Sequence, residues 1–261
     1  MRHELTFLLA LWKANLLAAM EYRVSFISQV VGMMLNNGVY FLFWVIFFDR
    51  FQQVRGWGLP DMFLLFGVVA TGFGLGALLF GNVLSLSEII SGGRLDYFLS
   101  LPRSVLIHVL ASRCISSGLG DATYGVISFL LARQYHVDSI FRFFLGSLLS
   151  MIIFLAFLVL VQSLSFWMGN ATLLSDQATN AIITFSLYPI TLFDGTAKLL
   201  LFTIIPAAFV GAIPAEFVRT SDWKQLIWLL LATLIFLTLA IFTFYRGLRR
   251  YESGSAIQPQ V

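Results

Sequence analysis

Long stretches without a charged residue constrain this chain more than any other feature. They cover residues 24–48, 62–87, 143–175, 177–193, 199–215 and 225–245. Another apolar stretch, residues 104–132, is interrupted only by Arg113 and Asp121. A helix needs about 20 mainly apolar residues to cross a bilayer. Because 59% of the residues are hydrophobic and only 11% are charged, we predict an all-α integral membrane protein.

The number of spans follows from stretch length and from prolines. Residues 177–193 and 199–215 would each form a helix of about 25 Å, against a hydrocarbon core of about 30 Å. Prolines remove helical hydrogen bonds, and this region contains Pro189, Pro206 and Pro214. We therefore expect one span at 172–190 and a re-entrant external hairpin at 195–216. The other five expected spans are residues 24–48, 62–84, 105–132, 143–168 and 223–245, which makes six in all.

Charge placement predicts the orientation. In residues 1–23 scattered charges separate apolar runs that are too short to span, which favours an interfacial helix. Six spans place both termini on one side, and Arg246, Arg249 and Arg250 after the last span favour the cytoplasm. The expected outside positive charges are Arg50, Arg55, Arg133, Arg142, Lys198, Arg219 and Lys224. Loops are short, so we expect one transmembrane domain over residues 1–261.

Sequence patterns of enzymes are missing. The chain contains no GxxxxGK[ST], GxSxG or HExxH pattern, and Cys114 is its only cysteine. Its three histidines fall at predicted membrane interfaces without acidic or nucleophilic neighbours. We therefore expect no catalytic residue, metal or cofactor in this chain. A net charge of +3 gives no reason to expect nucleic acid as a partner.

The segment of residues 85–104 is the longest predicted cytoplasmic connection. Gly92 and Gly93 allow a sharp turn, and residues 94–99 can form a short amphipathic helix that stops before a proline. Such a helix could fit a groove on a soluble partner, or the segment could be an ordinary surface loop. The candidate partner-binding residues are Glu88, Gly93, Leu95, Asp96, Phe98, Leu99 and Pro102.

Polar and small residues inside the predicted spans are the second set of candidates. Asp121 lies near the middle of the third span, where an ionised carboxylate is costly unless it is paired or wetted. We expect it to bond to another span or to face a pathway. Asn36 and Asn37 are expected to hydrogen-bond across helices or to a partner subunit. Gly72 and Gly76 form a GxxxG pair that favours packing within the subunit over a subunit interface.

The order of these features resembles the type-2 ABC exporter (ABC-2 type) permeases. The pattern that looks like their coupling loop, between spans two and three, is a glutamate, a glycine, Leu95, Asp96, Leu99, Pro102 and Ser104. The YP pair at 188–189, with the apolar run up to Pro206, is similar to their external hairpin after span five. The start of the chain resembles their interfacial connecting helix. The chain is most similar to short, stand-alone permeases whose ATP-binding subunit is a separate polypeptide.

The resemblance implies that two permease chains form the pathway and that two separate ATP-binding subunits hold ATP and Mg²⁺. Residues 88–99 would then seat in the ATPase and move the spans, and the protein would lie in a bacterial or archaeal plasma membrane. The second permease could be identical or related. The alternative functions are an ion-coupled secondary transporter, for which Asp121 alone is thin support, and a membrane scaffold without transport. The residues leave the cargo open: lipids, amphipathic drugs or hydrophobic peptides suit an apolar pathway, and Asp121 suits a cation.

Overall fold

The computed structural model describes residues 2–133 and 136–251; the regular secondary structure of this part is entirely helical, with one isolated bridge between Val54 and Trp57 in a connection. The expected domain of residues 1–261 and the expected helix of residues 1–23 therefore include positions outside the described residues. The helices are α1 (Arg2–Glu21), α2 (Arg23–Arg50), α3 (Leu59–Phe80), η1 (Gly81–Ser85), α4 (Leu86–Ser91), α5 (Leu95–Leu99), α6 (Val105–Ala111), α7 (Ser117–Leu131), α8 (Val137–Gln162), α9 (Ser165–Met168), α10 (Thr172–Ser186), η2 (Ile190–Leu192), α11 (Gly195–Thr203), α12 (Ala207–Val210), α13 (Ala212–Thr220) and α14 (Trp223–Leu248). The all-α prediction is confirmed.

Four helical stretches of the described residues are long and apolar enough to cross a membrane. They are Arg23–Arg50, Leu59–Ser91, Val137–Met168 and Trp223–Leu248. A fifth candidate forms if α11 and the α12–α13 pair, which meet at 65°, count as one broken span. The helices α7 and α10 have 15 residues each, about 22 Å, which is shorter than the hydrocarbon core. The chain is thus a multi-pass membrane protein.

The expected third span, residues 105–132, is not one continuous helix. It breaks between α6 and α7, where the backbone bonds to the end of α3: Gly81 N donates to the Arg113 carbonyl at 3.0 Å, and Ile115 N donates to the Ala77 carbonyl at 3.1 Å. The Asn82 amide also donates to the Val109 carbonyl at 3.0 Å. These tertiary bonds satisfy backbone groups that a continuous helix would satisfy internally.

The prolines of the expected hairpin act differently from one another. Pro206 lies at the break between α11 and α12, and Pro189 precedes the short η2 turn, so both interrupt helix as predicted. Pro214 lies in the first turn of α13, where a helical N–H has no intrahelical partner and a proline is tolerated. Pro214 therefore costs α13 no helical hydrogen bond, which differs from the expectation that each of the three prolines removes one.

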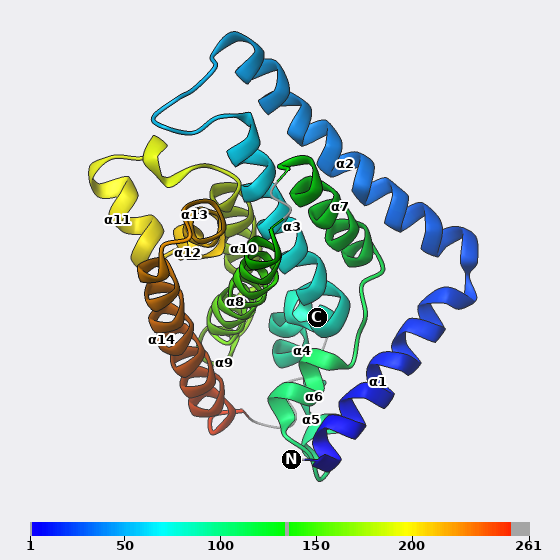
Figure 1. Cartoon of the computed structure of the whole chain (residues 1–261). Helices are drawn as coiled ribbons and strands as arrows, with labels where there is room; N and C mark the ends of the chain where they lie inside the picture. The colour runs from blue at the N-terminus through cyan, green and yellow to red at the C-terminus, as the bar shows by residue number, and fades with distance from the viewer. Residues whose placement is uncertain (1, 134–135, 252–261) are drawn as a thin grey trace.

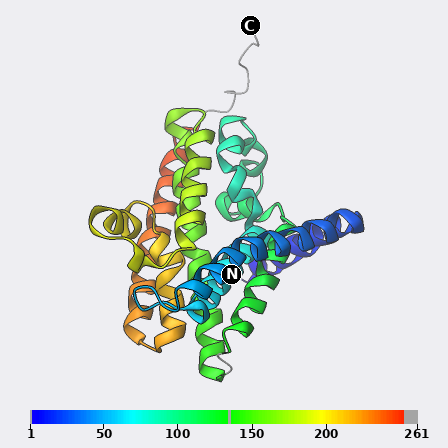
Figure 2. The same cartoon turned by 90° about the horizontal axis from the view of Figure 1, so that it is seen from above.

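The central helices are α3, α7 and α8, with α2 packed on α7 and α14 packed on α8 (Figure 1). Figure 2 shows α1 and α2 extending away from the bundle on one side. One end of the bundle gathers α5, the start of α1 and the end of α14, and the other end holds the α2–α3 connection and α11 (Figure 1). The segments predicted to be cytoplasmic and those predicted to be external thus lie at opposite ends of the bundle.

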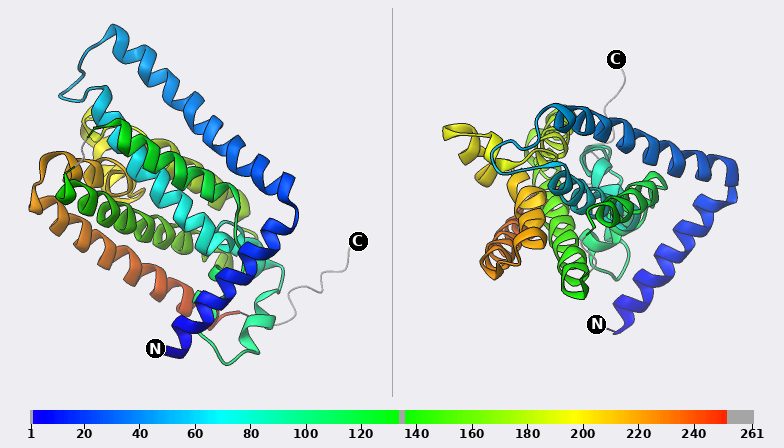
Figure 3. Two further views of the ribbon diagram at one scale, coloured as in Figure 1. Left: turned by 45° about the vertical axis from the view of Figure 1, so that its right-hand side comes forward. Right: turned by 45° about the horizontal axis from the view of Figure 1, so that its top comes forward.

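Two side-chain hydrogen bonds hold α1 across the end of the bundle that contains α5. The Trp12 indole N–H donates to the Leu79 carbonyl at 2.7 Å, and the Asn15 amide donates to the Ala111 carbonyl at 2.9 Å. Figure 3 shows α1 and α2 as the two arms of a V. The helix predicted near residues 1–23 is therefore present and separate from the first long helix.

Candidate functional site

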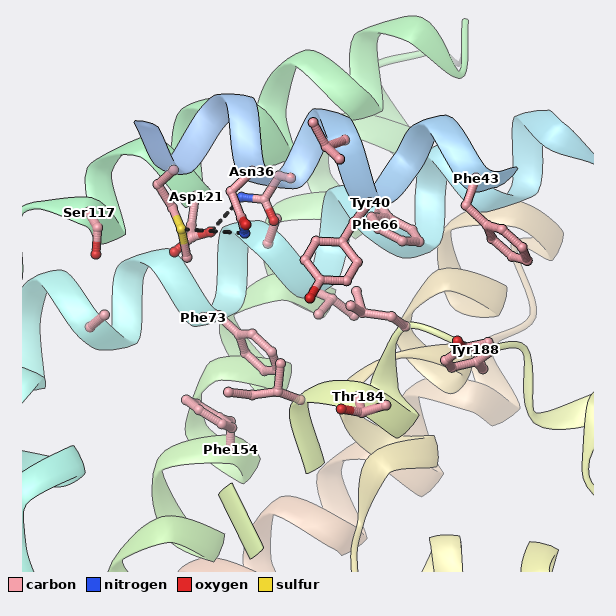
Figure 4. A pocket seen from close by; sticks show the side chains of 18 of the residues that line it. Asn36, Tyr40, Phe43, Phe66, Phe73, Ser117, Asp121, Phe154, Thr184 and Tyr188 are labelled. Carbon is pink, nitrogen blue, oxygen red and sulfur yellow. Dashed lines mark hydrogen bonds between the residues drawn. The ribbon is translucent and has the colours of Figure 1, made fainter. Parts of the chain in front are cut away.

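A cavity of about 640 Å³ lies between α2, α3, α7, α8 and α10 (Figure 4). All three polar residues that the sequence singled out as pathway candidates, Asn36, Asn37 and Asp121, line this cavity. The amide of Asn37 donates to Oδ1 of Asp121 at 2.6 Å. Asp121 therefore bonds to another helix and faces the cavity at once, which were the two alternatives the sequence left open.

Glycines place Asp121 against α2 and α3. A Cβ on Gly67 would lie 3.1 Å from the Gly125 carbonyl oxygen, and a Cβ on Gly74 would lie well inside van der Waals contact of Gly118. A Cβ on Gly120 would likewise overlap the Val30 carbonyl oxygen of α2. These close approaches leave no room for side chains, so α7 lies directly on both neighbours.

This glycine seam was not among the predicted contacts, although the sequence carries a signal for it. Gly67 and Gly74 are seven residues apart on α3, and Gly118 and Gly125 have the same spacing on α7. Residues seven apart lie on one face of a helix. The predicted GxxxG pair does pack within the subunit, because a Cβ on Gly72 would lie 3.1 Å from the Ser147 carbonyl oxygen of α8.

Aromatic side chains form much of the remaining wall. Tyr40, Phe66, Phe73 and Phe154 project between the helices in Figure 4, where Asp121 lies near one end of the cavity and Tyr188 near the other. Phe73 and Phe154 pack with ring centroids 4.2 Å apart. This wall could not be predicted from the sequence, because the chain has 27 phenylalanines and their positions alone do not single out these rings.

A smaller apolar cavity of about 190 Å³ adjoins the first one at its Tyr188 end. Phe43, Trp44 and Tyr188 line both cavities, and Trp44 meets Tyr188 edge to face at 5.6 Å. Pro189, from the expected hairpin set, is buried and lines the smaller cavity. Pro206 and Pro214 are buried in the α11–α13 region and line neither cavity. The two cavities therefore adjoin at this aromatic pair, beside α2.

The segment of residues 85–104 has the predicted turn and short helix. Gly93 has a φ of +71°, a conformation that glycine adopts without strain, whereas Gly92 does not, so Gly93 fixes the turn. Glu88 lies in α4, exposed, with its carboxylate 3.7 Å from Arg94. Pro102 follows α5 and is exposed. The sequence allowed either Gly92 or Gly93 to form the turn, and the backbone conformation assigns it to Gly93.

The apolar residues of α5 do not form one free face. Leu95 is fully buried and Phe98 is 9% exposed, with the Phe98 ring 5.2 Å from the His108 ring of α6. Tyr97 and Leu99 are exposed. Leu95 and Phe98, which were expected to contact a soluble partner together with Leu99, therefore attach α5 to its own bundle, and Leu99 alone of these three is exposed.

The chain returns to α5 at its C-terminal end. Tyr251 lies against Asp96, and burial, followed by the nearby Asp96 carboxylate, raises the pKa of Tyr251 to about 12. The Tyr251 ring also lies 6.3 Å from Phe166, which packs on Phe244 of α14. Asp96 is thus beside the end of the last span, a neighbour that sequence spacing could not indicate.

These features define a multi-pass membrane protein with a carboxylate-bearing aromatic cavity and a short helix at one end of its bundle. Residues 34–255 match the family described as ABC-2 family transporter protein, so this chain belongs to that family. No curated protein and no solved structure matches it. Members of this family are membrane subunits of ABC transporters and are not themselves ATPases, so membership implies association with ABC ATP-binding subunits.

Proposed function

We propose that this chain is the pathway-forming permease of an ABC exporter. Two permeases, identical or related, would assemble with two separate ATP-binding subunits that hold ATP and Mg²⁺, in the plasma membrane. The family match over residues 34–255 carries this proposal. The cavity between α2, α3, α7, α8 and α10 gives it a candidate pathway segment.

The proposed topology has six passes with both termini in the cytoplasm. The passes are α2, α3 with α4, α6 with α7, α8 with α9, α10, and α14. The α11–α13 region would be the external re-entrant hairpin, which its 65° bend and buried Pro206 support. Arg246, Arg249 and Arg250 at the end of α14 favour a cytoplasmic position for that end.

The coupling proposal follows from what α5 contacts. Through η1 and α4, α5 connects to α3, and by packing on α6 it connects to the chain that enters α7. Both α3 and α7 line the cavity. A displacement of α5 by the ATPase would therefore reach two walls of the cavity, provided that the two ATPase states bind α5 with different affinity.

The contact residues differ from those expected by sequence. We assign Tyr97 and Leu99, which are exposed, to the ATPase contact, and Leu95 and Phe98 to holding α5 in place. The expected contact residues that stay exposed around them are Glu88, Asp96 and Pro102.

We propose that the second permease packs against α2. Outward apolar side chains cover this helix, and few of its residues are buried within the chain. The exposed set includes Leu35, Val39, Leu42 and Ile46. A partner on this face would close the side of the cavity that Asn36 and Tyr40 line.

The test is affinity purification of the full-length chain from its native membrane, followed by identification of any ATPase that copurifies. Leu99→Asp should abolish the association, because it places a charge in the proposed apolar contact. Val137→Asp is the matched control, since Val137 is exposed at the opposite end of the bundle. Absence of an ATPase, or equal loss with both variants, would refute the proposal.

A further inference from the structure

The cavity contains one acidic side chain and no described basic one. Asp121 is 8% exposed, and Lys, Arg and His are all missing from the described residues that line the cavity. The Asn37 amide supplies a hydrogen bond but no countercharge. An ionised carboxylate in an apolar interior is costly unless it is wetted or paired, and a cation is the partner that compensates its charge. The cavity is therefore electrostatically suited to a positively charged occupant.

The side chains that line the cavity favour an organic cation over a metal ion. Ca²⁺ and Mg²⁺ need about six oxygen ligands, whereas Asp121 is the only carboxylate among the described residues that line this cavity, and most of the others are aromatic or aliphatic. Organic ammonium and phosphonium groups instead bind over aromatic faces, by cation–π attraction. Tyr40 and Phe73 extend from α2 and α3 next to the Asp121 end (Figure 4).

The size and shape of the cavity indicate what kind of molecule would carry the positive charge. A volume of about 640 Å³ falls in the range of about 300–1,000 Å³ that is typical of sites for drug-sized molecules. From Asp121, the cavity continues past Tyr40 to Tyr188, and the adjoining chamber is apolar. An occupant with one charged end and a bulky apolar body fits this gradient.

We propose that the cavity binds a lipophilic organic monocation, with its charge against Asp121 and its apolar body along the Tyr40–Tyr188 wall. This inference rests on the proposed transport function, because it names the substrate class of that pathway. An anionic amphiphile would meet the carboxylate without any compensating cation on the described lining.

The test uses two probes of similar shape and opposite charge, tetraphenylphosphonium and tetraphenylborate. The full chain is placed in neutral-lipid nanodiscs, and binding is measured by equilibrium dialysis with empty nanodiscs subtracted. We expect at least tenfold tighter binding of the phosphonium ion. Equal affinity for the two ions overturns the proposal, and this comparison requires no variant.

Variants then locate the site. Asp121→Asn should lower phosphonium affinity at least tenfold and remove the charge preference, and Asp121→Glu should retain the preference. Asp49→Asn, at an exposed position at the end of α2, is the matched control and should change nothing. An unchanged affinity in Asp121→Asn overturns the proposal. If that variant does not fold, Tyr40→Leu replaces it, with weaker phosphonium binding expected and unchanged binding contradicting the site.

The two proposals fail separately. Phosphonium binding needs no ATPase, so loss of charge preference in a chain that still copurifies with an ATPase refutes only the substrate class. Binding of the phosphonium ion by a chain that recruits no ATPase refutes the exporter function and leaves the cation site standing.

Discussion

Arg142 donates from Nη1 to the carbonyl oxygens of Phe217 and Val218, each at 3.1 Å, and thereby joins the start of α8 to the end of α13. Its side chain is 4% exposed and pairs with Asp138 at 2.7 Å. The last carbonyls of a helix have no intrahelical partner, so this arginine caps α13. The guanidinium of Arg142 can be buried because the last carbonyls of α13 accept its hydrogen bonds and the Asp138 carboxylate balances its charge.

Removing this cap should destabilise the fold. Arg142→Ala leaves buried carbonyl groups unsatisfied, and we expect the free energy of unfolding to fall by about 2–4 kcal/mol. Arg50→Ala, at an exposed position at the end of α2, should have little effect. Thermal unfolding of the purified chain in detergent measures both. Equal midpoints for the two variants would contradict the capping role.

The glycine seam gives a second prediction. Gly74→Ala should lower the thermal midpoint and weaken cavity binding, because its methyl group would overlap the backbone of α7 at Gly118 and Ala122. Gly32→Ala on α2 is the control, as its Cβ would meet nothing within 4 Å. Alanine is the better helix former, so the control should be neutral or slightly stabilising. A Gly74→Ala protein as stable as wild type would show that the seam can open without cost.

The turn before α5 gives a third prediction. Gly93→Val should reduce ATPase copurification, because a β-branched residue is strained at a φ of +71° and would displace α5. Gly93→Asn should retain most of it, since asparagine tolerates this conformation. Quantifying the ATPase bound per permease compares the two. Equal recovery with valine and asparagine would exclude a role for the turn geometry.

The long helices could be predicted because length and apolar composition are local properties. Charge-free runs located α2, α3 and α14 to within a few residues. The predicted start of the fourth span at residue 143 was too late, because α8 begins at Val137 and includes the buried Arg142. A run that stops at a charge cannot reveal that the charge is satisfied by residues 75 positions away.

The site could be predicted only as separate residues. Asp121, Asn36 and Asn37 stood out because polar groups are rare in spans, but their common cavity depends on how α2 packs on α7. The break between α6 and α7 has the same origin, since Asn82 and the end of α3 stabilise it from outside the segment. Apart from the seven-residue glycine spacing shared by α3 and α7, these contacts between distant helices leave no signal in the sequence of either helix.

The contact between Tyr251 and Asp96 makes the segment that follows α14 sensitive to alkaline pH. An exposed tyrosine has a pKa of about 10, and burial, with the Asp96 carboxylate, raises the pKa of Tyr251 to about 12. The neutral phenol is therefore the form that the folded chain favours. Its contribution to stability is complete below about pH 10 and is lost as the pH rises toward 12.

Spectrophotometric titration of tyrosinate in wild type and Tyr251→Phe isolates this residue as the difference between the two curves. The difference should have a midpoint near pH 12, and Asp96→Asn should move it to lower pH without restoring it fully, because burial is the larger cause. Glu88→Gln, at another exposed carboxylate of the same segment, should leave the midpoint unchanged. A midpoint near pH 10 in wild type would mean that Tyr251 is not seated against α5, and the end of α14 would then move independently of that helix.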